Sequence, residues 1–177
     1  MLEFTSSHNL FFHHAKSTCG RPSGGLALMI RKELLGNLVA KSDSFFAVKV
    51  SNVVIFVVYF PTNYRNDISE RKFSLTCISI AKLVSKYEDE GLSCLLFGDF
   101  DCELSDPENN RSFILLHACP SLTYVGNDHD FTYIHQYGSV SQLDYFYCSS
   151  MIKPSSATLV LRDYSIPTTC RSVFLNK

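Results

Sequence analysis

The sequence predicts a layered α/β (α+β) domain, and three observations carry that prediction. Several apolar runs are rich in β-branched and aromatic residues, which is typical of buried strands. One long segment, residues 67–90, instead repeats its apolar positions at helical spacing. Another apolar run, residues 93–97, follows it and completes a strand, helix and strand succession. The length of 177 residues fits one such domain.

The first expected elements are a turn and three strands. "GRPSGG" at residues 20–25 combines proline with glycines, which favours a turn, and the apolar run at residues 26–30 follows as a strand. "SFFAVKV" and "NVVIFVVYF" are separated by the short break Ser51-Asn52, so they predict a β-hairpin. The second run is apolar at nearly every position, and we expect it to be buried on both faces.

The helix at residues 67–90 begins with a capping-box pattern formed by Asp67 and Glu70. Its apolar positions recur at Phe73, Cys77, Ile80 and Val84. A shorter helix is expected at residues 111–118. Further strands are expected at residues 122–125, 131–135, 142–148 and 157–161.

The composition narrows the choice of partner and compartment. The formal net charge of -1 is unlike that of proteins that hold nucleic acid through Lys and Arg alone, so any grip on a polyanion must be local or assisted by a metal. Seven scattered cysteines without a C-x-x-C pair favour a reducing, intracellular compartment, nuclear or cytoplasmic. The N-terminus lacks a signal-peptide pattern, and the longest apolar run is far shorter than the ~20 residues of a spanning helix. We expect no membrane partner, and the oligomeric state stays open.

Two aspartates follow the strand expected at residues 93–97. "GDFD" places Asp99 and Asp101 two positions apart, at the kind of strand end where ligands gather in layered α/β folds. If the extended conformation persists through Phe100, both carboxylates point to one face, where they would suit Mg²⁺ or Mn²⁺. An acidic turn after a buried strand explains the same motif, and "GDFD" alone favours that simpler interpretation.

Three other strand ends carry polar side chains. Tyr59 lies at the end of the long apolar run, and Asp163 follows the strand expected at residues 157–161. Asp144 lies among aromatic residues in "SQLDYFYCS", so its carboxylate should hydrogen-bond to a backbone or functional group. The histidines lack the compact spacing of zinc ligands.

Five motifs, in order, resemble the endonuclease/exonuclease/phosphatase superfamily, and most closely the endonuclease domain of LINE-type (non-LTR) retrotransposons, which precedes a reverse transcriptase. Family members have G-R-x-S-G-G before a strand, then Y-x-P, G-D-x-N, L-D-Y and S-D-H with a proline soon after. This chain has "GRPSGG", "YFP", "GDFD", "SQLDYFY" and "RDYSIP". The resemblance covers residues 20 to about 167 and implies a domain at residues 20–177, after an irregular segment at residues 1–19.

The resemblance implies a two-sheet β-sandwich flanked by helices and Mg²⁺-dependent (or Mn²⁺-dependent) hydrolysis of a phosphodiester in DNA. It implies that Asp99 activates the attacking water at the metal site and that Tyr59 steadies the phosphate. Asp144 resembles the carboxylate that orients a catalytic histidine, and Asp163 resembles a metal ligand.

Three departures from the family pattern lead us to expect impaired activity. Nothing before Gly20 matches the family's N-terminal strand or its metal-binding Glu, so we expect the N-terminal strands to be lacking. Asp101 replaces an asparagine, which exchanges a donating amide for an acceptor-only anion. Tyr164 stands where the family has its catalytic His, and a phenol cannot act as an imidazolium near neutral pH.

Three functions stay open. The first is a divalent-metal-dependent DNA endonuclease domain of retrotransposon origin with impaired activity, in which Asp101 or another carboxylate replaces the lost metal ligand. The second is a catalytically inactive remnant that binds, at most, nucleic acid or a protein. The third is a phosphatase that acts on small phosphoesters, which the lack of a basic surplus permits.

Overall fold

The computed structural model of the protein describes residues 6–14, 25–60, 67–101, 118–125, 132–134, 138–150 and 152. Within these ranges the strands are β1 (His8–His13), β2 (Leu26–Arg31), β3 (Asn37–Lys41), β4 (Phe45–Val50), β5 (Val53–Tyr59), β6 (Ser93–Asp99), β7 (Leu122–Tyr124), β8 (Tyr133–Ile134), β9 (Val140–Ser141) and β10 (Asp144–Ser149). The helical elements are the 3-10 turn η1 (Lys32–Leu34) and the long helix α2 (Asp67–Asp89).

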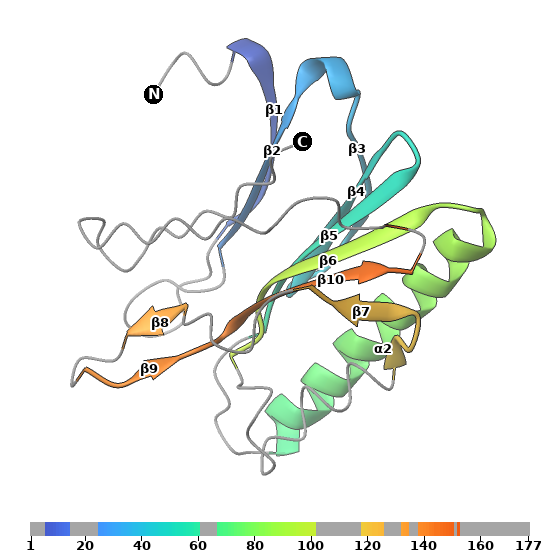
Figure 1. Ribbon diagram of the computed structural model, residues 1–177. Helices are drawn as coiled ribbons and strands as arrows, with labels where there is room; N and C mark the ends of the chain where they lie inside the picture. Colours follow the sequence, from blue (N-terminus) through green and yellow to red (C-terminus); the bar gives the residue numbers. More distant parts are fainter. Residues whose placement is uncertain are drawn as a thin grey trace.

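A mixed six-stranded sheet forms the centre of the molecule, in the order β3-β4-β5-β6-β10-β7. The helix α2 covers one face of this sheet, and the antiparallel pair β1-β2 lies on the other side (Figure 1). A second short pair, β8-β9, lies beyond the Asp144 end of β10. This layered arrangement confirms the predicted fold class.

The hairpin of β4 and β5 shows why both faces of the sheet are covered. Four successive residues of β4, from Phe45 to Val48, are buried. Phe45 packs in a cluster beneath α2, which we call the helix-side cluster. Phe46 packs on the opposite face, beneath the antiparallel pair β1-β2. We call this second cluster the hairpin-side cluster; its buried residues are Leu26, Ile30, Phe46, Val48 and Val57. Alternation along a strand sends neighbouring side chains to opposite faces, so a run that is apolar throughout fits a sheet with two covers.

The helix α2 joins β5 to β6, which are parallel neighbours in the sheet. The four apolar positions predicted to face the core are all buried. The helix ends in a left-handed residue, Gly91, at φ +77°, whose N–H donates to the carbonyl of Glu88 while Leu92 N–H donates to that of Tyr87. This pair of bonds satisfies carbonyls that a helix end leaves unpaired. The predicted strand, helix and strand unit is therefore confirmed.

The prediction of an irregular segment at residues 1–19 is wrong for His8–His13, which forms β1 and pairs with β2 over six residues. Phe11 turns inward to the hairpin-side cluster, while Leu10 and Phe12 are about half exposed. The strand forms its backbone hydrogen bonds with β2, but its side chains are only partly buried. Its sequence therefore shows only a weak alternation of apolar and polar residues.

The strand β3 was not predicted either, because it is short and mostly exposed at the edge of the sheet. The predicted strands at residues 26–30, 93–97, 122–125 and 142–148 are present with shifts of a few residues, and Tyr133–Ile134 is the described part of the strand predicted at residues 131–135. The predicted strand at residues 157–161 lies outside the described residues, as do nearly all of the helix at residues 111–118 and the turn at residues 20–25. In the described part of the chain, no helix combines the length and apolar character needed to cross a membrane.

Candidate active site

Three of the predicted site residues form one row across three neighbouring strands. Tyr59 ends β5, Asp99 ends β6 and Asp144 begins β10. The strand register pairs Tyr59 with Asp99, and Asp99 in turn with Asp144. Because paired strands lie about 4.8 Å apart, the phenol and the two carboxylates start from adjacent backbone positions. We call these three residues the carboxylate row.

The three side chains of the row lie on the same face of the sheet. Tyr59 packs against the hairpin-side cluster, and so does Phe97, which lies two residues before Asp99. Tyr145 packs in the helix-side cluster, so the preceding Asp144 faces the other way. All three members of the row are half-buried. The row therefore lies on the hairpin side, at one end of the strands.

Backbone hydrogen bonds continue beyond the row and hold its members in register. Phe60 N–H donates to the carbonyl of Asp99 at 2.8 Å, and Phe100 N–H donates to the carbonyl of Leu143 at 2.8 Å. These bonds link β5 to β6 and β6 to the residue before β10. The relative positions of Tyr59, Asp99 and Asp144 are therefore set by main-chain pairing, which is stiffer than side-chain contact.

Gly98 brings β6 close to β5 immediately before Asp99. Its φ is +143°, a conformation that side chains rarely adopt, and a Cβ built there would overlap the carbonyl oxygen of Val58. A glycine is needed at this position for both reasons. Asp99 therefore directly follows the position where the backbones of β5 and β6 approach each other closely.

Asp101 lies in a turn rather than in a continued strand. Its φ is +49°, which aspartate tolerates better than most residues, and its N–H donates to Oδ1 of Asp99 at 2.9 Å. The extended conformation thus ends at Asp99, and the condition under which both carboxylates would share a face is not met. One oxygen of Asp99 holds the turn, and Asp101 lies beside the row.

Thr132 supports Asp144 from outside the sheet. Its hydroxyl oxygen accepts the N–H groups of Leu143 at 2.9 Å and of Asp144 at 3.0 Å, and its own N–H donates to the carbonyl of Ser141. One hydroxyl thereby ties the start of β10 to the β8-β9 pair. Thr132 could not be predicted as part of the site, because no local pattern relates it to an aspartate twelve residues later.

The charges of the row limit what it can bind. Two carboxylates at paired positions of neighbouring strands repel each other unless a cation or a proton lies between them. In the described residues, however, no three side chains of His, Cys, Asp or Glu come together as a metal-binding group. The residues present therefore fit a cation held by two carboxylates together with a substrate phosphate, as Mg²⁺ often is, rather than a complete protein cage. Asp163 and Tyr164 lie outside the described residues.

The buried thiols do not resemble catalytic nucleophiles. Burial raises the pKa of Cys94 from 9.0 to about 12, with smaller contributions from Glu88 and Cys119. Burial also raises the pKa of Cys119 to about 11. A thiolate is the reactive form of cysteine, so these two side chains act as small core residues at neutral pH.

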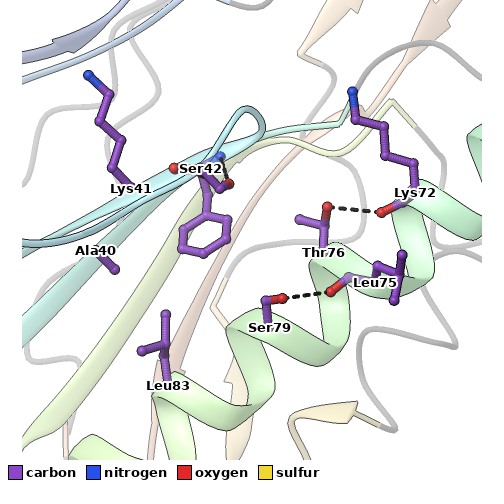
Figure 2. Close-up of a pocket in the computed structure, with 9 residues that line it drawn as sticks. Ala40, Lys41, Ser42, Lys72, Leu75, Thr76, Ser79 and Leu83 are labelled. Carbon is purple, nitrogen blue, oxygen red and sulfur yellow. Dashed lines mark hydrogen bonds between the residues drawn. The ribbon is translucent and has the colours of Figure 1, made fainter.

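A groove of about 350 Å³ lies away from the row, between α2 and the segment that joins β3 to β4 (Figure 2). We call it the helix–edge groove. Its lining includes Phe45, Leu75, Leu83 and Lys72 and contains no carboxylate. It belongs to the helix side of the sheet, so it is separate from the carboxylate row.

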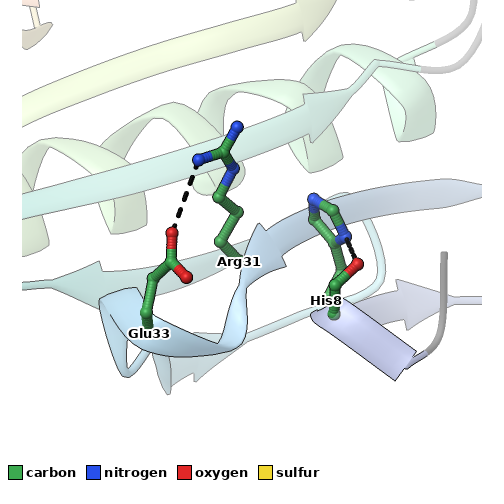
Figure 3. A network of polar contacts seen from close by, with 4 residues as sticks. His8, Arg31 and Glu33 are labelled. Atoms are coloured by element: carbon green, nitrogen blue, oxygen red, sulfur yellow. Dashed lines mark hydrogen bonds and ion pairs between the residues drawn. The ribbon is translucent and has the colours of Figure 1, made fainter.

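The histidine at the start of β1, His8, is half-buried at the surface of the β1-β2 pair. Figure 3 shows His8 beside Arg31, its register partner on β2, and the ion pair of Arg31 with Glu33 at 3.4 Å. Both side chains of that pair are 70% exposed, so the pair contributes little stability. The Nδ1 of His8 lies 2.8 Å from the hydroxyl of Ser7. These contacts place His8 at the surface of the β1-β2 pair, where it is half-buried.

No protein-family model matches the sequence, and no curated protein matches it. Solved structures match by fold. NExo from Neisseria, a 3' phosphatase bound to a product DNA hairpin, superimposes with a TM-score of 0.57 at 14% identity, over 83% of this chain and 68% of its own. The human Nocturnin catalytic domain with a bound sulfate anion gives 0.53 at 14% identity, over 82% and 62%. CdtB, the biologically active subunit of Cytolethal Distending Toxin, gives 0.56 at 12% identity, over 93% and 64%.

These neighbours have the endonuclease/exonuclease/phosphatase fold, and the α/β sandwich of this chain is of the same type. The identities are low, so the likeness is one of fold. The chain covers 62% to 68% of the lengths of these three structures.

Proposed function

We propose that the protein is a divalent-metal-dependent phosphoester hydrolase whose site is the carboxylate row. The observation that carries this proposal is the register that sets a phenol and two carboxylates side by side on one face, at the end of three strands. Ligands gather at strand ends in layered α/β folds, and the fold of the neighbours supports the same class of chemistry.

Each member of the row has a distinct role in this proposal. Asp99 and Asp144 would hold Mg²⁺ or Mn²⁺ together with the phosphate, and Asp163 is a further proposed ligand. Asp144 would thus take a metal role here in place of orienting a histidine, which the motifs lack. A bound cation would neutralise phosphate charge and lower the pKa of water. Asp99 orients the attacking water and accepts its proton, while the Tyr59 hydroxyl donates a hydrogen bond to a phosphate oxygen as negative charge grows there.

We infer that the substrate is a phosphodiester in DNA and that the domain is of retrotransposon origin. The order of the five motifs supports this inference, and NExo was solved with a product DNA hairpin. We expect slow turnover, because the metal-binding Glu and the catalytic His of the resembled family have no counterparts in the motifs. Groups of one site act as a unit, so two such losses lower the rate by orders of magnitude.

A plasmid-nicking time course tests this function. The wild-type protein, Asp99→Asn and the matched control Asp89→Asn are compared with Mg²⁺, with Mn²⁺ and with a chelator. Asparagine keeps an oxygen that can accept the Asp101 N–H, so the turn after β6 is retained. We expect metal-dependent nicking that falls at least ~100-fold in Asp99→Asn and persists in Asp89→Asn, an exposed position on α2. Equal nicking by all three proteins, or nicking that survives the chelator, would contradict the proposal.

A non-catalytic binding module is the second candidate, and it is favoured by the lack of a three-ligand metal group in the described residues. A small-substrate phosphatase is the third. Chromogenic phosphate monoesters and diesters separate these candidates. Turnover of monoesters alone would indicate a phosphatase, whereas a folded protein that hydrolyses neither substrate would indicate a binding module.

A further inference from the structure

A layer of aromatic side chains lies beneath the carboxylate row, on the opposite face of the sheet. Each member of the row is followed directly in the sequence by an aromatic residue, and these residues are Phe60, Phe100 and Tyr145. All three pack in the helix-side cluster and are at most 4% exposed. The ring centroids of Phe60 and Phe100 are 5.5 Å apart, and those of Phe100 and Tyr145 are 5.6 Å apart. The residues that support the row from behind are therefore in contact with one another.

Tyr145 also reaches the chain that leads into Asp144. Its phenolic hydroxyl donates to the carbonyl of Gln142 at 2.7 Å, three residues earlier in the chain. Asp144 lies inside the loop that this bond closes, and its side chain faces away from the helix-side cluster in which Tyr145 packs. A hydrogen bond from the buried face thus holds the segment that carries the carboxylate.

The two residues before Asp144 are held from three further elements. The Nε2 atom of Gln142 donates to the hydroxyl of Tyr124 on β7 at 2.6 Å. The Leu143 N–H donates to the hydroxyl of Thr132, and the Leu143 carbonyl accepts the N–H of Phe100. Both residues lie between β9 and β10, so these bonds, and not strand pairing, fix their positions.

The two carboxylates of the row are fixed by different means. Oδ1 of Asp99 accepts the N–H of Asp101, so one bond acts on the carboxylate itself. At Asp144, the bonds from Thr132 and Tyr145 act on the backbone at and before the residue. The direction of the Asp144 carboxylate therefore depends on the backbone angles at the start of β10. A displacement of about 1 Å in a reacting group can lower a rate by ~100-fold.

We propose that Tyr145 is a positioning residue, whose phenol fixes Gln142 from the buried face and thereby sets the direction of the Asp144 carboxylate. The inference rests on the proposed function, because it concerns how the carboxylate row meets a cation and a phosphate. Tyr145 does not touch the substrate, since its ring is buried on the helix side of the sheet. It acts through the backbone, so its effect falls on the transition state more than on substrate binding.

NMR spectroscopy and kinetics on the full-length chain test the proposal with two matched variants. Tyr145→Phe removes only the hydroxyl and keeps the ring. Tyr147→Phe is the control, because it makes the same change on the same strand and face, two residues further from Asp144. Three-bond couplings across the Cα–Cβ bond of Asp144 report whether its side chain keeps one rotamer. Plasmid nicking at saturating Mg²⁺, over a series of plasmid concentrations, gives kcat and KM. Circular dichroism and urea unfolding confirm that both variants are folded.

The proposal predicts a single Asp144 rotamer in the wild type and in Tyr147→Phe, and couplings averaged over rotamers in Tyr145→Phe. It also predicts that kcat falls at least ~10-fold in Tyr145→Phe while KM changes less than ~3-fold, and that Tyr147→Phe resembles the wild type. The proposal is overturned if Asp144 keeps the wild-type couplings in Tyr145→Phe, or if the two variants lose kcat equally.

The two measurements separate this proposal from the proposed function. A wild-type protein that does not nick DNA would contradict the proposed function. The couplings need neither metal nor substrate, so they would still decide whether Tyr145 fixes Asp144. Metal-dependent nicking together with unchanged couplings in Tyr145→Phe would support the proposed function and overturn the positioning role.

Discussion

The two faces of the six-stranded sheet are packed very differently. In the described part of the chain, the helix-side cluster contains nineteen buried residues, including Phe56, Phe60 and Tyr147, and the hairpin-side cluster contains five. The carboxylate row lies on the hairpin side. A fully packed core excludes water and ligands, whereas polar side chains that meet a substrate must stay partly accessible. Among the described residues, the helix side therefore holds most of the core, and the carboxylate row lies on the side with the smaller cluster.

The largest expected effect comes from Gly98, on which both faces depend because it allows β5 and β6 to meet. Gly98→Ala forces a side chain onto the backbone of Val58 and strains the positive φ. We expect a loss of at least ~4 kcal/mol in the free energy of unfolding, measured by urea denaturation. Gly138→Ala is the matched control, with a positive φ but open space around it, and should cost about 1 kcal/mol. Similar losses in the two variants would contradict this account of the close approach.

Two adjacent leucines of β6 measure the difference between the faces directly. Leu96 is fully buried on the helix side, and Leu95 is half-buried and points to the other side. We expect Leu96→Ala to lower the free energy of unfolding by about 3 kcal/mol and Leu95→Ala by about 1 kcal/mol. Urea unfolding of both variants provides the measurement. Equal losses would mean that the hairpin side is packed as tightly as the helix side.

Thr132 sharpens the comparison at the row itself. Thr132→Val removes the acceptor shared by the Leu143 and Asp144 N–H groups, so we expect a loss of about 2 kcal/mol. The amide hydrogens of Leu143 and Asp144 should exchange faster, while those in the centre of β5 should change less. Thr132→Ser keeps the hydroxyl and should retain most of the protection. Unchanged exchange at both amides in Thr132→Val would argue against this support of Asp144.

At neutral pH the buried thiols give the smallest effect, because their influence on stability appears only in alkali. Burial raises the pKa of Cys94 from 9.0 to about 12 and that of Cys119 to about 11, so in this range the folded protein holds protons that the unfolded chain has lost. Stability is therefore unaffected below about pH 8 and falls as the pH rises from about 9 toward 11. Urea unfolding at a series of pH values measures the slope. Cys94→Ala should make it shallower than in the wild type, and an unchanged slope would assign the alkaline loss to other groups.

The part of the fold that could be predicted is the part whose local pattern matches its final environment. The run of β5 is apolar because both of its faces are covered, and α2 repeats its apolar residues because one side faces the core. In contrast, β1 and β3 bury few of their own side chains and take their places by pairing with β2 and β4. A short stretch of sequence does not show which strand will pair with it, so such strands are hard to predict.

The candidate site was predictable as a set of strand ends but not as an arrangement. Tyr59, Asp99 and Asp144 could each be placed after or within an apolar run, yet their adjacency follows from strand order and register. The turn at Asp101 depends on a hydrogen bond to Asp99, so the extended backbone that would place both carboxylates on one face does not form. The role of Thr132 arises from the position of β8, which no local signal fixes.

The order of strands in the sheet has a consequence for how the molecule forms. β7 precedes β10 in the chain, yet among the described strands it pairs only with β10, which inserts between β6 and β7. Until β10 has been synthesised, β6 has an open edge and β7 has no place in the sheet. Such long-range closure slows folding, and an uncovered edge invites association between chains. A nascent chain halted before Asp144 would therefore be a substrate for chaperones, and its release would wait for a single six-residue strand.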